Sequence, residues 1–396
     1  MIAKLKEVAA SLENGFIKKW KADGKKVLGY TCTFIPEEII HAAGLLPYRV
    51  RGIGTNSLSI GDSYFGPVNC SFPKCMLQLA GEGAYRFLDG AILSNGCDSM
   101  RRLEECWRKA GDDYPGARPD YYAYFSVPHK AVDYSIQFYA EELQEMIASL
   151  ERHFKVKITK DKLKKAIKLY NESRKLLQKL DSLRYRKDVP ISGEDALAIL
   201  IAGHAIPREE FNGLLKDITT GLEKAPGIAN GKKRLMLIGS ASDDVEFVKV
   251  LEDAGAVVVA DTVCFGSRLH DSLVEEIADP VHALASHYLN QSICPRMLGY
   301  YKDRKAFIQG IISQAGVDGI ILQNVRFCDL HGSENGVLER DLEAAGVPCM
   351  RLEREYGPLV ETGRIRMRVD AFMERINSVR IQAAPLSSAS SATRST

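Results

Sequence analysis

Apolar runs and helical periodicities alternate along the first third of the chain. The run at 25–34 predicts a strand that leads into a turn at Pro36, and residues 37–43 then follow a helical pattern that Gly44 ends. Further helices are expected over 1–20, 74–87 and about 99–109, and further strands over 44–52 and 87–95. Strands that alternate with helices over short links predict a parallel sheet flanked by helices.

A lysine-rich helical pattern fills the middle of the chain, from about residue 133 to 217. The stretch at 224–233 has the Pro and Gly content of a linker, and the apolar strand 234–240 that follows it opens a second α/β unit. In that unit we expect a helix over about 243–254, strands at 256–263, 319–325 and 347–353, and a terminal helix. The pattern therefore predicts two α/β units separated by helices.

We expect this organisation to divide the chain into an N-terminal α/β domain, a helical domain, a C-terminal α/β domain and a tail. Their predicted bounds are 1–130, 131–230, 231–382 and 383–396. The tail is small and polar, and its composition is typical of disorder.

Composition is that of an ordinary globular protein, with 45% apolar and 26% charged residues among 396. A net charge of +2 gives no reason to expect nucleic acid or an anionic membrane as a partner. The sequence contains no run of eighteen apolar residues, and its N-terminus lacks the apolar core of a secretory signal. We therefore expect a cytoplasmic protein.

Nine cysteines change this picture, because disulfides rarely persist in the cytoplasm and an odd number cannot pair completely. Cys97, Cys264 and Cys328 each follow a predicted strand, at the sheet edge where open α/β sheets bind ligands. Three more lie in polar or turn-like settings within reach of that edge: Cys70, Cys106 and Cys294. A small buried hydrophobe is the alternative for any one of them. Soft thiolates favour iron–sulfur or zinc, and the chain has no C-x-x-C pattern.

Several segments resemble the superfamily of 2-hydroxyacyl-CoA dehydratase D-components and benzoyl-CoA reductase subunits, from about residue 25 to 375. The segments that carry the likeness are GYTCTFIPEEIIHAAGLLPYRVRG (29–52), GPVNCSFPKCML (66–77), FLDGAILSNGCDSMRRL (87–103), DTVCFGSR (261–268), ICPRM (293–297) and ILQNVRFCDLHGSENGVLERDLEAAGVPCMRLEREY (321–356). The resemblance implies two Rossmann-like parallel-sheet units with an all-helical middle region.

The resemblance also implies a cluster and its ligands. Cys70, Cys97 and Cys328 are similar in context to the cysteines that hold a single [4Fe–4S] cluster in the dehydratases. The additional Cys106, Cys264 and Cys294 point to the closer likeness, the double-cubane proteins, with three cysteines for each cubane of an [8Fe–9S] cluster. Of the three cysteines left over, Cys349 is expected in the core and Cys32 beside the loop that faces the cluster, and Cys75 has no assigned role.

In that family a separate ATP-dependent activator with its own [4Fe–4S] cluster supplies low-potential electrons. The chain has no GxxxxGK phosphate-binding loop, which agrees with ATP on a partner, and a homodimer is expected. The implied function is a reductase component for a small, kinetically resistant substrate. Two alternatives stay open: a [4Fe–4S] dehydratase or benzoyl-CoA reductase-type subunit that acts on a CoA thioester, and an electron-storage protein without a substrate.

Three residues are candidate proton donors for such a reduction. Glu37 and Glu38 follow Pro36 next to the loop expected at the cluster, and His331 stands three residues after Cys328. The alternatives are a dipole interaction for acidic residues in a first helical turn and a structural hydrogen bond for the histidine.

Overall fold

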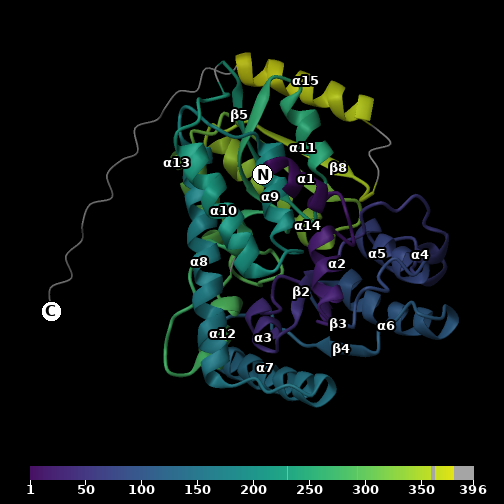
Figure 1. Ribbon diagram of the computed structural model, residues 1–396. Helices are drawn as coiled ribbons and strands as arrows, with labels where there is room; N and C mark the ends of the chain where they lie inside the picture. Colours follow the sequence, from purple (N-terminus) through teal and green to yellow (C-terminus); the bar gives the residue numbers. More distant parts are fainter. Residues whose placement is uncertain (230, 292, 358–361, 379–396) are drawn as a thin grey trace, which may run out of the picture.

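Two parallel sheets of four strands form the framework of the computed structural model, which describes residues 1–229, 231–291, 293–357 and 362–378 (Figure 1). The first sheet has the order β2-β1-β3-β4 and the second the order β6-β5-β7-β8. The two orders are the same when each unit is numbered from its own first strand. This confirms the predicted α/β fold of two Rossmann-like units.

The first sheet and its helices occupy the N-terminal third of the chain. Its strands are β1 (Val27–Tyr30), β2 (Leu46–Arg49), β3 (Gly90–Ser94) and β4 (Tyr121–Phe125). Its helices are α1 (Ile2–Ala9), α2 (Gly15–Ala22), α3 (Glu37–Ala42), α4 (Ser59–Tyr64), α5 (Ser71–Gly81) and α6 (Asp98–Asp113).

The expected single helix over 1–20 is wrong, because α1 ends and α2 begins within it. Asn14 starts the second helix: its side-chain oxygen accepts hydrogen bonds from the amides of Phe16 and Ile17. The edge strand β4 and the short helix α4 are elements that the sequence pattern did not predict.

The middle of the chain is helical, as the lysine-rich pattern predicts, and contains four helices between the two sheets. They are α7 (Asp133–Phe154), α8 (Lys160–Tyr185), α9 (Gly193–Ala202) and α10 (Arg208–Glu223). The long helix α8 contacts α3 of the first unit and strand β6 (Ala256–Thr262) of the second. Because the middle helices contact both sheet units, they tie the two halves together.

The second unit repeats the first in the C-terminal part of the chain. Its other strands are β5 (Lys233–Gly239), β7 (Gly319–Val325) and β8 (Cys349–Arg354). Its helices are α11 (Val245–Glu252), η1 (Ser267–Leu269), α12 (Pro280–Leu289), α13 (Tyr301–Ala315), α14 (Asp329–Ala344) and α15 (Thr362–Ser378). The predicted tail at 383–396 lies outside the described residues, and the domain bounds at 130 and 230 stay predictions.

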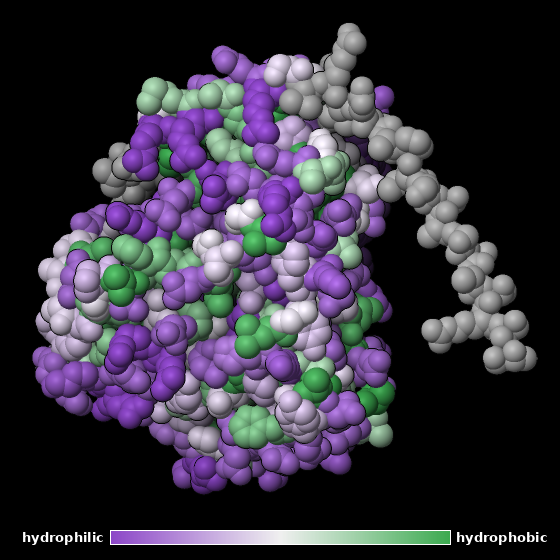
Figure 2. All heavy atoms as spheres, turned by 180° about the vertical axis from the view of Figure 1, so that it is seen from behind, coloured by the Kyte–Doolittle hydropathy of each residue, from purple (hydrophilic) through white to green (hydrophobic). Residues whose placement is uncertain are grey.

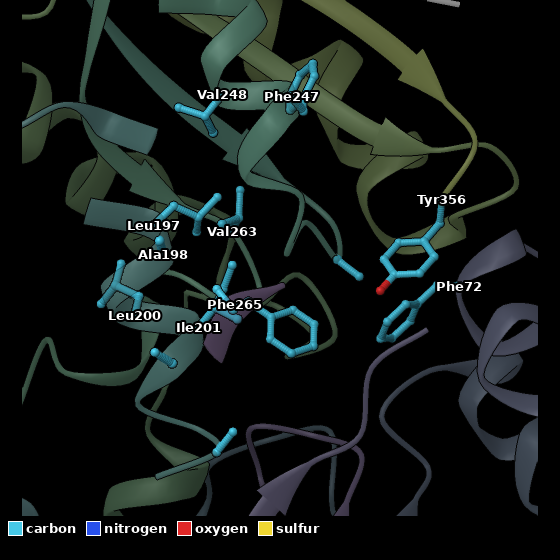
Figure 3. Close-up of a cluster of buried hydrophobic side chains, with 14 of the residues drawn as sticks. Phe72, Leu197, Ala198, Leu200, Ile201, Phe247, Val248, Val263, Phe265 and Tyr356 are labelled. Carbon is cyan, nitrogen blue, oxygen red and sulfur yellow. The ribbon is translucent and has the colours of Figure 1, made fainter. Parts of the chain in front are cut away.

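The core is continuous across the two halves, since its largest buried cluster contains side chains of both sheet units. Figure 3 shows Phe72 of α5 next to Phe265 and Tyr356 of the second unit. The ring centroid of Phe72 lies 6.1 Å from that of Phe265 and 4.8 Å from that of Tyr356. These aromatic contacts fix the loop after β6 against the start of α5.

The surface seen from behind carries hydrophobic residues in small groups among hydrophilic ones (Figure 2). Within the described residues, no helix is both long enough and apolar enough to cross a membrane.

Candidate metal centre

Three cysteines stand at the starts of three helices and line one cavity of about 790 Å³. Cys70 immediately precedes α5, Cys97 precedes α6 and Cys328 precedes α14. Burial raises the pKa of each thiol, and a backbone amide of the first helical turn partly offsets this by lowering the pKa. Because a helix N-terminus carries a partial positive charge, three helices favour negative charge at this one place.

Strand topology explains why these positions meet. In a sheet of this order the connections leave in opposite directions between the first and third strands, and ligands bind in the crevice beyond that point. Cys97 follows β3 and Cys328 follows β7, so both stand at such a point in their own sheet. Cys70 is held there from α5, where the Ser71 hydroxyl accepts a 2.8 Å hydrogen bond from the Tyr356 amide.

A second group of cysteines borders the first. Cys264 follows β6, Cys294 lies in the loop after α12, and Cys32 lies just beyond β1. Negative charge on Cys264 or Cys294 raises the pKa of Cys328, and charge on Cys32 raises the pKa of both Cys294 and Cys97; burial is the larger cause in each case. The six sulfurs of the two groups are therefore electrostatic neighbours.

Cys32, a member of the second group, contacts the segment that leads to Cys97 of the first. A side chain added to Gly96 would place its Cβ 2.9 Å from the Cys32 sulfur, so Cys32 touches the residue that precedes Cys97. β1 ends at Tyr30, which puts Cys32 at a strand end like Cys97 and Cys264. The sequence analysis did not place Cys32 at a strand end, because the predicted strand runs through Cys32 to residue 34.

The structure does not bring Cys106 to the other five predicted ligands. It lies on α6 nine residues after Cys97, which is about 13 Å further along the helix. Its thiol donates to the Tyr64 carbonyl oxygen at 3.5 Å. Cys75 donates to the Tyr356 carbonyl oxygen at 3.7 Å, and Cys349 lies in β8, as expected for a core residue.

Burial raises the pKa of the Cys70 thiol to about 12, and burial also raises the pKa values of Cys97, Cys294 and Cys328. Such thiols stay protonated at neutral pH unless a metal takes the place of the proton. Soft sulfur donors together with convergent helix N-termini fit an anionic iron–sulfur group. Among the residues described, no three metal-ligating side chains are grouped around the position of one metal ion.

Glu37 lies away from the cysteine cavity, in a buried network beside a smaller cavity of about 60 Å³. Its carboxylate accepts hydrogen bonds from Tyr30 and Arg208, and His204 Nδ1 lies 3.1 Å from it. Burial opposes ionisation, but Arg208 and His204 outweigh it and hold the pKa of Glu37 well below its usual value. Glu37 is thus a buried carboxylate rather than a ready proton donor.

Glu38 is fully buried, and its carboxylate lies 2.6 Å from Arg174 and accepts a 2.7 Å hydrogen bond from the Tyr288 hydroxyl. His331 is the candidate nearest the cysteines, on the first turn of α14. Burial, with Arg268 and Arg304, holds the pKa of His331 well below its usual value, so the ring is neutral at pH 7. Of the three candidate donors, only His331 lies at the cysteine groups.

The fold defines an α/β protein of two Rossmann-like units, in which Cys97 and Cys328 follow the third strand of their own sheet. The sequence profile of the 2-hydroxyglutaryl-CoA dehydratase D-component family matches residues 32–376, and the chain belongs to that family. Among similar proteins, one of the benzoyl-CoA reductase subunits of Thauera aromatica is 30% identical over 83% of this chain and 86% of its own length.

Two dehydratase subunits match almost end to end. The (R)-phenyllactyl-CoA dehydratase beta subunit of Clostridium sporogenes is 24% identical over 94% of this chain and 97% of its own. The beta subunit of (R)-2-hydroxyglutaryl-CoA dehydratase of Acidaminococcus fermentans is 24% identical over 95% and 99%. The chain is accordingly an enzyme component of the oxidoreductase or dehydratase kind.

Proposed function

We propose that the chain is an iron–sulfur reductase component that holds an [8Fe–9S] double cubane and passes low-potential electrons to a small, kinetically resistant substrate. The observation that carries this proposal is the pair of adjacent cysteine groups. A single [4Fe–4S] cluster needs at most four thiolates, whereas the two neighbouring groups together contain six cysteines.

Cys70, Cys97 and Cys328 would hold one cubane, and Cys32, Cys264 and Cys294 the other. Cys32 therefore takes the place that the sequence pattern assigns to Cys106, because Cys106 points its thiol at the Tyr64 carbonyl. Three cysteines for each half then remain, all at strand ends, helix starts or loops of one crevice.

When bound, such a group stores and delivers electrons at low potential. The chain supplies the surroundings. The helix N-termini favour negative charge, and the cavity of about 790 Å³ gives a substrate access to the first cysteine group. His129, Arg101 and Tyr124 line that cavity and can bind or orient a substrate there.

The electrons would come from an ATP-dependent activator with a [4Fe–4S] cluster, because the chain has no phosphate-binding loop of its own. A homodimer is the proposed assembly. The second candidate function is that of one component of a CoA-thioester dehydratase or reductase with a single [4Fe–4S] cluster, which the names of the relatives favour. A CoA thioester is then the substrate, and a second, nonidentical subunit is required.

Alanine variants of single cysteines distinguish these proposals. In anaerobically purified protein, Cys32→Ala should reduce the iron content to about half and leave the spectrum of one cubane, while Cys106→Ala retains the full content. Cys75→Ala is the control, since Cys75 is a buried cysteine that lies outside both groups. Full iron in Cys32→Ala together with loss in Cys106→Ala would refute the assignment.

A turnover assay separates an enzyme from an electron store. The protein reduced by Ti(III) citrate is mixed with a CoA thioester or a small unsaturated molecule, and reoxidation of the cluster is followed together with product. Stoichiometric reoxidation with product supports the reductase, and product from the thioester alone supports the second candidate. A reduced cluster that persists with every substrate supports electron storage.

A further inference from the structure

Nine arginine side chains are almost completely buried among the described residues, and six of them have a carboxylate within 4 Å. The pairs are Arg51–Asp243, Arg174–Glu38, Arg184–Asp261, Arg208–Glu37, Arg304–Glu334 and Arg354–Asp244. The other three are Arg49, Arg268 and Arg296, and for these no carboxylate of the described chain lies within that distance.

Arg49 makes direct contact with the second cysteine group. Its guanidinium donates to the Cys264 sulfur at 3.0 Å and to the Cys264 carbonyl oxygen at 2.7 Å. The same group stacks over the ring of Phe265 at 3.8 Å from the centroid, which fixes its orientation. Arg49 is only 1% exposed, so water does not compensate its charge.

Arg296 and Arg268 reach the cysteines from two other directions. Arg296 lines the cavity of the first cysteine group and donates to the carbonyl oxygens of Gly96 at 3.1 Å and Pro128 at 2.8 Å. Arg268 donates to the carbonyl oxygens of Gly239 and Thr262, and its charge favours the thiolate of Cys294. All three cations therefore surround the same crevice.

A buried charge without a counter-charge is strongly unfavourable, and proteins pair such charges. Within the described part of the chain, six of the nine buried arginines are paired in this way. The three exceptions gather where the six cysteines gather, which indicates that their counter-charge is a bound group with several negative charges. Carbonyl oxygens orient these guanidinium groups but leave their net charge uncompensated.

We propose that Arg49, Arg268 and Arg296 are the counter-ions of the iron–sulfur group, and that Arg49, through its hydrogen bond to a ligand sulfur, raises the reduction potential of the half held by Cys264. The inference rests on the proposed function. A positive charge and a hydrogen bond to sulfur both stabilise the reduced state, which carries one more negative charge.

The test compares Arg49→Met and Arg49→Lys with a matched control, Arg354→Met. Arg354 is also buried and stacked on a ring, Phe247, but it pairs with Asp244. Midpoint potentials come from redox titration followed by electron paramagnetic resonance. We expect a more negative midpoint for Arg49→Met, a smaller shift for Arg49→Lys and no shift for Arg354→Met.

Melting of the cluster-free full-length chain supplies a readout that needs no iron. Arg49→Met should melt at or above the wild-type temperature, because it removes an uncompensated buried charge, while Arg354→Met melts lower, because it leaves Asp244 unpaired. If the two variants melt in this way but the wild-type chain binds no iron, the result supports an anionic group in this crevice and refutes the proposed cluster.

An unchanged midpoint in Arg49→Met, or melting of its cluster-free form as low as that of Arg354→Met, overturns the inference. If Arg49→Met binds no iron, Arg49→Lys decides: full iron in that variant supports a counter-ion role for the charge, and loss of iron in both variants assigns Arg49 a structural role.

Discussion

Replacement of Glu38 by Gln tests whether this residue is a proton donor or half of a structural ion pair. The variant keeps the shape of the side chain and removes its charge. Arg174, which lies 2.6 Å from the carboxylate and is 6% exposed, is then left as a buried cation with only neutral partners. Breaking a buried pair by removal of one partner costs about 3–5 kcal/mol, and the remaining amide hydrogen bonds place this variant near the lower value.

The expected change in melting temperature follows from chain length. At about 2.1 cal/mol/K per residue, the unfolding entropy of 396 residues is about 0.8 kcal/mol/K. A loss of about 3 kcal/mol therefore lowers the melting temperature by about 4 °C. Iron content should not change, because Glu38 bonds to Arg174 and Tyr288 and not to a cysteine.

The assay is thermal unfolding at a fixed scan rate, with iron measured on the same samples. Glu145→Gln is the matched control, since Glu145 is exposed on α7. The double variant Glu38→Met, Arg174→Met removes both charges and should recover most of the lost stability. A Glu38→Gln protein that melts with the wild type but loses turnover would refute this reasoning and restore Glu38 as a proton donor.

Two further predictions concern pH and close packing. Burial, with the charge of Arg174, lowers the pKa of His287 to about 3. Below about pH 6.5 this histidine is therefore protonated in the unfolded chain but not in the folded chain, so the free energy of unfolding falls as the pH falls. His287→Phe should lose about 2 kcal/mol less than the wild type in urea unfolding between pH 7 and 5, and equal losses would contradict this. Gly96→Ala should lower the iron content, because the added Cβ would lie 2.9 Å from the Cys32 sulfur. Gly213→Ala is the control and should keep the full iron content, because the space around Gly213 is open. A Gly96→Ala protein with full iron would count against Cys32 as a ligand.

Much of the candidate site could be predicted from sequence, because several cysteines follow the ends of predicted strands. The strands β3, β6 and β7 begin with apolar runs and are buried along their whole length, so the cysteines that follow them could be placed at one sheet edge. The same approach failed for β4, whose YYAYF sequence is only partly buried at the edge of the first sheet. An edge strand has fewer neighbours to impose an apolar pattern.

The sequence alone could not predict which cysteines reach the crevice. Cys97 and Cys106 are close in sequence, but the helix between them carries Cys106 away from the crevice. Cys32 reaches the crevice because β1 ends two residues earlier, and the exact end of a short strand is poorly marked in an apolar segment. The contact of Arg49 with Cys264 joins residues 215 positions apart, and no local pattern predicts it.

Iron and acid-labile sulfide per chain in anaerobically purified protein test the central claim most directly. The two cysteine groups predict about eight irons and nine sulfides per chain, as in an [8Fe–9S] double cubane. About four irons, unchanged when Cys32, Cys264 or Cys294 is replaced by Ala, would contradict the double cubane, and stoichiometric zinc without sulfide would contradict an iron–sulfur protein altogether.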